Sequence, residues 1–345
     1  MTFTEEQEAL RAAVRALLSR ESAPWAPLCE QIGVAGLGVP ERFGGLGTGL
    51  REAQIVAEEL GRVLSPVPFL GSAIVTTQAI LASGEDEACA RLLPLLVKGT
   101  IGALAWCGQE GGWPTEDVPL RATSDDRVTG HAHYVLDGDR AEILLVIAKS
   151  PGRLGLYEVD VTSTGVRRTS KVGLDQTRRL ATVEFDGAQA RQLGESDFSV
   201  ALRRVRNGAC AVLAAEQAGA AARALEITVE HTKQRHQFGR PIGGFQALKH
   251  RMANLHILVE TARSAAYAAP DSERAATVAK VHCSEALEQV AAEMIQLHGG
   301  VGITWDHPAH RYLKRAHGSS QLFGRPHEHL ARLRELPVAL DTTSE

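Results

Sequence analysis

The sequence predicts a mainly helical α+β fold with an N-terminal helical domain, a central β domain and a C-terminal four-helix bundle. Two changes in pattern support this prediction. Apolar residues recur at helical spacing through the first hundred residues and again after residue 197. Between these stretches, short β-branched segments alternate with Gly, Asp and Pro, which is typical of strands and turns. We therefore place the domains at residues 1–104, 105–196 and 197–345.

The N-terminal domain is expected to consist of helices separated by one long loop. Thr4 can cap a helix that runs to about Ser19, because acidic residues fill its first turn, where they favour the helix dipole. A Gly-rich stretch at 31–50 breaks the helical pattern. Further helices are predicted near 51–63, 71–83 and 86–97.

The central domain is predicted from short segments rich in β-branched and aromatic residues. Four segments carry this pattern most clearly, and turn-forming residues separate them. They are HYVLDG at 133–138, EILLVIAK at 142–149, LGLYEVD at 154–160 and ATVEFDGA at 181–188.

Long helical patterns return after the β domain, and one compact loop, RHQFGRPIGGFQALKH at 235–250, interrupts them. Pro241 cannot continue a helix, and Gly243 and Gly244 let the main chain approach a ligand or another subunit closely. An ordinary helix-to-helix turn is the alternative for this loop. We expect helices at about 198–233, 245–268 and 272–298, and a shorter final helix that ends near 333.

The bulk composition is that of an ordinary globular protein. The chain has 345 residues, which exceeds one typical domain, and 44% of them are hydrophobic and 23% charged. The net charge of −4 gives no reason to expect a nucleic acid as partner. The N-terminal segment is acidic and amphipathic, and no window is apolar for long enough to span a membrane. We therefore expect neither targeting nor membrane association.

The cysteines and histidines predict neither a disulfide framework nor a metal site. The cysteines are odd in number and never in C-x-x-C spacing, so we expect reduced thiols in the cytoplasm. They are Cys29, Cys89, Cys107, Cys210 and Cys283. Four histidines near the C-terminus lack acidic or cysteine partners at ligand spacing, so we predict no bound metal. They are His307, His310, His327 and His329.

Residues 235–250 resemble the signature of the acyl-CoA dehydrogenase family, R-x-x-F-G-x-x-I-x-x-F-Q followed by an apolar helix. Two further stretches resemble the family, QLHGGVGIT at 296–304 and GVAGLGVPERFGGLG at 33–47. The three motifs stand in the family's order and are spread over most of the chain, which argues against chance. The signature residues that match are Arg235, Phe238, Gly239, Ile242, Phe245 and Gln246.

The resemblance implies FAD as cofactor and an assembly of subunits. In the family, the signature loop and the Q-x-x-G-G stretch of one subunit reach the adenine and pyrophosphate end of the neighbour's FAD. The residue types suit this role, because Arg offers a fork of donors to a phosphate and Gly lets backbone N–H groups approach an anion. Without the resemblance, a helix-end cation and a helix C-cap explain the same residues equally well. By resemblance we assign FAD contacts to Arg235, Phe238, Gln246, Gln296, Gly299 and Gly300.

The β domain departs from the family pattern. Where the family carries T-E-P-x-x-G-S-D, this chain has CGQEGG at 107–112, and where the family carries W-I-T-N or W-I-S-N, it has YVLD at 134–137. Leu136 replaces a side chain whose hydroxyl can donate to the flavin ring, and leucine has no donor. We therefore expect the flavin-ring site of this subunit to be degraded.

The catalytic base of the family is missing as well. Removal of an α-proton from an acyl thioester requires a desolvated carboxylate with a raised pKa. By resemblance, the two positions that carry this Glu fall on Phe323 and Ala209, and neither is a base. Glu216 lies seven residues after Ala209, on the same helical face. It is either a displaced base or, as we favour, a carboxylate bonded to a neighbouring helix or loop.

We favour an FAD-dependent acyl-CoA dehydrogenase subunit that is inactive alone and completes a partner's FAD site in an α2β2 heterotetramer. The resemblance implies an acyl-CoA substrate from fatty-acid or sterol side-chain β-oxidation, and an acceptor like electron-transfer flavoprotein. One alternative is a self-sufficient homo-oligomer that uses Glu216 or another carboxylate as base. Another is a pseudoenzyme that serves as a scaffold or binds acyl-CoA without redox chemistry.

Overall fold

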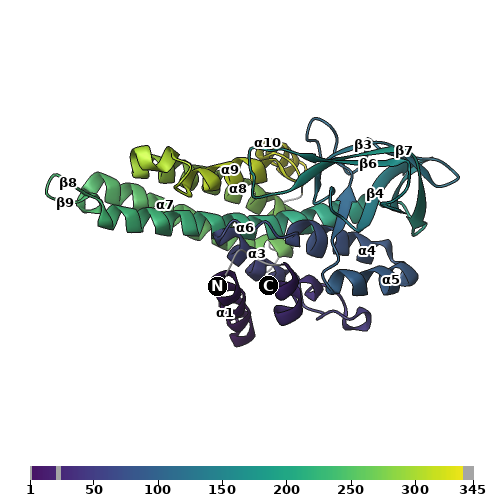
Figure 1. Cartoon of the computed structure of the whole chain (residues 1–345), viewed down its shortest axis with the longest axis horizontal. Helices are drawn as coiled ribbons and strands as arrows, with labels where there is room; N and C mark the ends of the chain where they lie inside the picture. Colours follow the sequence, from purple (N-terminus) through teal and green to yellow (C-terminus); the bar gives the residue numbers. More distant parts are fainter. Residues whose placement is uncertain (1, 21–24, 337–345) are drawn as a thin grey trace, which may run out of the picture.

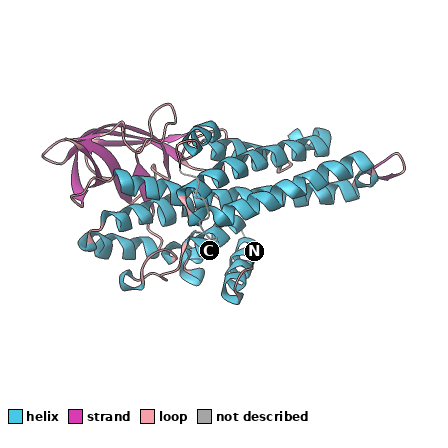
Figure 2. Ribbon diagram, turned by 180° about the vertical axis from the view of Figure 1, so that it is seen from behind, coloured by secondary structure: helices cyan, strands magenta, loops and turns pink. Residues whose placement is uncertain are grey.

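The computed structural model describes residues 2–20 and 25–336. The described chain is elongated, with a β domain at one end and a small β hairpin at the other (Figure 1). The long helix α6 (Ser199–Gln234) connects the two ends, and the N-terminal helices pack on one side of it (Figures 1 and 2). The predicted mainly helical α+β fold class is confirmed, while the exact domain boundaries stay predictions.

The first helix forms as the sequence predicts. Helix α1 (Glu5–Leu18) follows Thr4, whose hydroxyl accepts a hydrogen bond from the Gln7 N–H at 3.2 Å. The Gln7 side chain accepts from the Thr4 N–H at 3.2 Å, so two donors at the helix start are paired. The other helical segments before the β domain are α2 (Trp25–Pro27), η1 (Leu28–Ile32), η2 (Val34–Gly36), η3 (Glu41–Phe43), α3 (Leu50–Arg62), η4 (Phe69–Thr76), α4 (Thr77–Ser83) and α5 (Asp86–Val97).

Helices α3 and α6 cross with their backbones in close approach. A Cβ atom added at Gly61 of α3 would lie 2.0 Å from the carbonyl oxygen of Glu216. One added at Gly219 of α6 would lie 2.0 Å from the carbonyl oxygen of Glu58. Only glycine allows this contact. The crossing fixes the N-terminal helices against the middle of α6, beside Glu216.

The β domain is a seven-stranded sheet with the order β1-β4-β2-β3-β7-β5, and β6 pairs with β7. Because β4 also pairs with β5, the strands β4, β2, β3, β7 and β5 form a closed ring around an apolar core. The four predicted segments overlap β3, β4, β5 and β7. The strands are β1 (Gly102–Ala105), β2 (Arg121–Ala122), β3 (Arg127–Leu136), β4 (Ile143–Ser150), β5 (Arg153–Val159), β6 (Val166–Lys171) and β7 (Leu180–Leu193).

The C-terminal bundle is built from α6 and three further long helices, followed by a short one. The prediction of one final helix is wrong, because two helices stand there. Phe323 and Gly324, between them, have φ angles of 59° and 114°, which a right-handed helix cannot contain. The elements are α7 (Gln246–Ala268), α8 (Glu273–His298), α9 (Ala309–Gln321) and α10 (Pro326–Leu333), with the hairpin β8 (His236–Gln237) and β9 (Arg240–Pro241) and the turns η5 (Ile242–Gly244), η6 (Ala269–Asp271) and η7 (Gly299–Ile303).

None of the helices in residues 2–20 and 25–336 is long and apolar enough to cross a membrane.

Candidate functional site

Phe323, at the first family position of the catalytic Glu, lies inside a cluster of three aromatic rings. Its ring is parallel to that of Trp106 with centroids 6.2 Å apart, and 5.0 Å from that of Trp113. The two indoles meet edge to face at 4.7 Å. Only 1% of the Phe323 surface is exposed. The position therefore carries a buried apolar ring, and this ring has no group that can take a proton.

Ala209, at the second family position, lies in the fully buried part of α6. Its methyl group belongs to the main hydrophobic core, which also contains Trp106 and Phe323. A methyl group has no proton-accepting atom. Neither family position therefore carries a base in this chain.

Glu216 is bound by two guanidinium groups. Its Oε1 atom accepts a hydrogen bond from Arg315 Nη1 at 2.8 Å and another from Arg178 Nη2. Arg315 also pairs with Asp175, whose Oδ2 atom lies 3.0 Å from the Arg315 Nε. Both guanidinium groups bind the same carboxylate oxygen, which holds Glu216 in contacts within the chain. This geometry favours a structural role for Glu216 over the role of displaced base.

The segments expected around a flavin ring make contacts within the chain itself. Leu136 is buried in the main core, and a Cβ added at Gly71 of η4 would lie 2.9 Å from its Cβ. Tyr134 has a φ of 54°, and its hydroxyl donates to the Gln109 carbonyl at 3.3 Å. The Cys107 thiol donates to the Gly112 carbonyl at 3.1 Å, and burial raises its pKa.

The signature loop forms the hairpin at the end of α6. Phe238 and Gly239 connect its two strands with φ angles of 52° and 77°, which is the left-handed pair that a two-residue hairpin turn needs. The Phe238 side chain is 92% exposed. The Arg240 guanidinium lies 4.0 Å from the centre of the Phe245 ring, which holds the base of the loop. The aromatic ring at the tip is thus presented to the surroundings.

The assigned FAD-contact residues all lie on the surface at this end of the molecule. Arg235 directly follows α6 and is exposed, and no carboxylate in the described part of the chain pairs with it. Gly299 has a φ of 62° and a ψ of −142°, which only glycine adopts readily, and a Cβ on Gly300 would meet nothing within 4 Å. Gln246 begins α7 and Gln296 lies in the last turn of α8, and both are exposed. Their contact with FAD stays a prediction.

Three histidine rings in contact connect the end of α6 to the region of the glycine stretch, and sequence reasoning did not foresee them. The His298 ring, at the end of α8, lies 4.2 Å from that of His231 in α6 and 4.3 Å from that of His307. Burial lowers the pKa of His231 and of His307.

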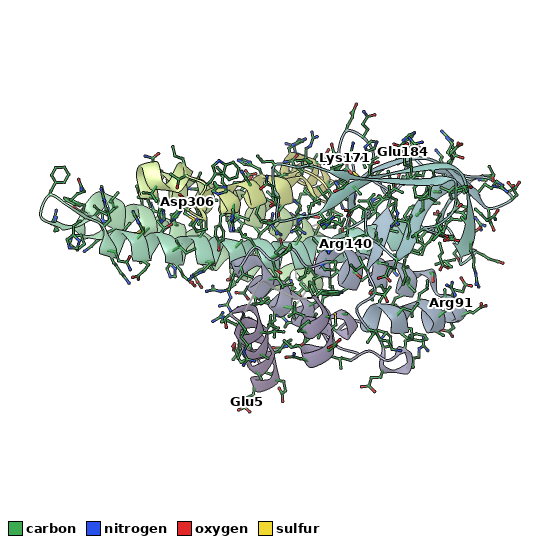
Figure 3. The ribbon with its side chains drawn as sticks, in the orientation of Figure 1. Glu5, Arg91, Arg140, Lys171, Glu184 and Asp306 are labelled. Carbon is green, nitrogen blue, oxygen red and sulfur yellow. The ribbon has the colours of Figure 1, made fainter. Side chains whose placement is uncertain are left out.

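Figure 3 shows Asp306, beside His307, toward the hairpin end, and Glu184 of β7 toward the opposite end. In the described segments, no group of three or more His, Cys, Asp or Glu side chains is placed to hold a metal.

A second residue that sequence reasoning missed is Arg206. It lies one helical turn before Ala209 on α6 and is only 7% exposed. It faces a cavity of about 820 Å³ between the loop after β1 and α10. The spacing to Ala209 was the available signal, because residues three apart share a helix face.

The fold, the signature loop and the glycine stretch together define a class of flavin-dependent dehydrogenase. Residues 4–100 match the N-terminal domain of acyl-CoA dehydrogenases, and residues 198–329 match their C-terminal domain. The chain belongs to the acyl-CoA dehydrogenase family, whose members are FAD-dependent oxidoreductases.

Among individual proteins, the chain is 39% identical to acyl-CoA dehydrogenase IpdE2 of Mycobacterium tuberculosis, over 96% of this chain and 98% of that one. The structure of a variant of the Tcur3481-Tcur3483 steroid ACAD is similar, with 30% identity, a TM-score of 0.87 and coverage of 96% and 97%. The ChsE4-ChsE5 complex from Mycobacterium tuberculosis is similar as well, with 28% identity, a TM-score of 0.87 and coverage of 98% and 99%.

Proposed function

We propose that this chain is the subunit that completes a homologous partner's FAD site in a heteromeric acyl-CoA dehydrogenase. The observation that carries the proposal is the position of Arg235 and Phe238. They lie beyond the end of α6, whereas the chain's own β domain lies near the start of that helix (Figure 1). A helix of 36 residues is about 54 Å long. A flavin in contact with this hairpin therefore belongs mainly to another subunit.

The family residues that this chain retains would serve a partner's FAD site, and those that it lacks would serve its own site. Arg235 would donate to a phosphate or ribose oxygen, and the open backbone at Gly299 and Gly300 would receive an anionic group. Phe323 and Ala209 supply no base, so the carboxylate that removes the α-proton would come from the partner. When bound, FAD supplies the acceptor for the hydride that leaves the β-carbon.

Exposed apolar side chains near the assigned residues support a subunit contact. Two large apolar side chains lie shortly after the glycine stretch. Ile303, at the end of η7, is 72% exposed, and Trp305 is 70% exposed. Together with Phe238 they place large apolar groups at the hairpin end. Large exposed apolar groups gathered in one region mark a protein contact. We propose that the homologous partner covers it, in an α2β2 arrangement.

The substrate that we propose is an acyl-CoA thioester with a fatty-acid or steroid side chain. The likeness to a steroid acyl-CoA dehydrogenase at 30% identity supports the steroid class. We propose an acceptor like electron-transfer flavoprotein, as the family resemblance implies. We also propose a cytoplasmic location, since all five cysteines are buried free thiols, and such thiols persist in a reducing compartment.

The test uses the chain alone and the chain co-expressed with a homologue that carries the catalytic Glu. The expected result is a yellow, active complex and a colourless or inactive single chain, measured with an artificial electron acceptor. Replacing the partner's Glu should abolish turnover, because general-base catalysis contributes roughly 10²–10⁴-fold. Turnover by the isolated chain that is lost in Glu216→Gln would instead establish the self-sufficient enzyme. A colourless complex that binds acyl-CoA without turnover would establish the pseudoenzyme.

A further inference from the structure

The cavity beside Arg206 has one polar wall and one apolar wall. The apolar wall contains Trp113 and Phe323, and the polar wall contains Arg206 from α6 with His329 and Arg332 from α10. With a volume of about 820 Å³, the cavity is in the range of small-molecule sites. It lies near the start of α6, and the hairpin that carries Arg235 lies at the opposite end (Figure 1).

Arg206 is a buried cation without an anionic partner. Its Nη1 donates to the Trp113 carbonyl at 3.2 Å, and its Nε is buried with no hydrogen-bond partner. In the two described segments, no carboxylate pairs with it. Arg332, its neighbour, already binds Glu273 at 2.8 Å. A buried guanidinium without a counter-charge is destabilising, so its presence calls for an anion that arrives from outside.

The surrounding charges select the kind of anion. Glu110, Asp117 and Glu328 line the same cavity, and they repel a phosphate dianion more strongly than a singly charged anion. The Glu328 carboxylate already accepts from the Arg325 N–H at 2.7 Å at the start of α10. A carboxylate carries a single charge, and its two oxygens match the planar donors of arginine. The indole of Trp113 and the rings of Pro114 and Pro119 then suit an apolar body attached to that carboxylate.

We propose that this cavity binds an organic carboxylate with an apolar ring body, and that the carboxylate pairs with Arg206. Burial and the charge of Arg332 lower the pKa of Arg206 to about 10, so the guanidinium still carries its charge at neutral pH. Every group in the proposal belongs to this chain, and the cavity lies away from the hairpin that is assigned to a partner's FAD. It gives the chain a ligand of its own in addition to its contacts at the hairpin.

The first experiment measures binding to the full chain by isothermal titration calorimetry with 2-naphthoate, 2-naphthamide and inorganic phosphate. The expected result is that naphthoate binds at least tenfold more tightly than the uncharged amide, and that phosphate binds more weakly than naphthoate. Equal affinities for the acid and the amide would overturn the proposal. The absence of naphthoate binding at millimolar concentration would overturn it too.

Substitutions then assign the binding to Arg206. Arg206→Gln should weaken naphthoate at least tenfold and leave the amide unchanged, and Arg206→Lys should retain part of the preference for the acid. Arg121→Gln is the matched control, because Arg121 lies exposed at the rim of the same cavity. The urea midpoint of ligand-free Arg206→Gln should equal or exceed that of wild type, since an unpaired buried charge is removed. A lower midpoint with unchanged naphthoate affinity would make Arg206 purely structural.

Discussion

The ring of Phe323 is parallel to the indole of Trp106, with an interplanar angle of 14° and centroids 6.2 Å apart. Phe323 takes the family position of the proton-abstracting Glu, and its side chain is buried against the Trp106 and Trp113 rings, where a carboxylate would lose hydration. We therefore predict that Phe323→Glu does not make the isolated chain active and lowers its stability. Loss of the ring alone is worth about 3–5 kcal/mol.

The measurement for this prediction is turnover with an artificial acceptor together with urea denaturation. Phe323→Leu is the control, because it keeps apolar volume without adding charge. We expect the Leu variant to be the more stable of the two. Acyl-CoA oxidation by the isolated Phe323→Glu chain would contradict the account of a degraded active site.

The second prediction concerns the ion pairs of Glu216. Glu216→Gln removes the charge between Arg178 and Arg315 and leaves Asp175 as the carboxylate paired with Arg315. Breaking a buried pair in this way destabilises a protein by about 3–5 kcal/mol. We expect this loss in denaturation experiments, while turnover of the complex with the partner persists at low temperature. Glu226→Gln, in a more exposed pair with Arg62, should change stability far less.

The third prediction concerns the hairpin. Arg235→Ala should weaken FAD retention by the complex by about 1.5–3 kcal/mol, the usual value of a charge-assisted hydrogen bond. Arg235→Lys should be damaging as well, because an ammonium group does not reproduce the planar fork. Flavin release on dilution, followed by fluorescence, measures both effects. If the Arg235→Ala complex retains FAD as well as wild type does, the loop is only a helix-to-helix turn.

The fourth prediction is a pH dependence that arises from His329. Burial, followed by the charges of Lys280 and Arg332, lowers the pKa of this histidine to about 3. The unfolded chain, with an ordinary value near 6.5, binds more protons between these two pH values. Stability should therefore fall as the pH drops from about 6.5 toward 3, and this group should have no effect above that range.

Urea denaturation at a series of pH values tests this dependence. In the folded chain the His329 Nε2 lies 3.1 Å from the Phe323 carbonyl oxygen, to which it donates when neutral. His329→Gln can still donate there but cannot be protonated, so the acid-dependent slope should shrink. His327→Gln, an exposed neighbour on α10, should keep the wild-type slope. An unchanged slope in His329→Gln would assign the dependence to other groups.

The sequence predicted the fold class well because its signals are local. The Thr4 cap, the helix periodicity and the turn chemistry around Gly239 each depend on neighbours a few residues away. It missed β1, β2, β6, the hairpin strands β8 and β9, and the break between α9 and α10. β6 is largely exposed and lacks a clear alternation, and the break depends on a left-handed backbone at Phe323, which no residue type signals reliably.

The sequence by itself determined which groups are present: a family signature at 235–250, a glycine stretch at 299–300, and no carboxylate at positions 209 and 323. Only the tertiary structure decided what surrounds each charge. Glu216 meets Arg178 and Arg315, which are 38 and 99 residues away, while Arg206 meets no carboxylate in the described chain. The reason is physical, because burial and charge pairing depend on which distant segments pack together, and no short pattern encodes that.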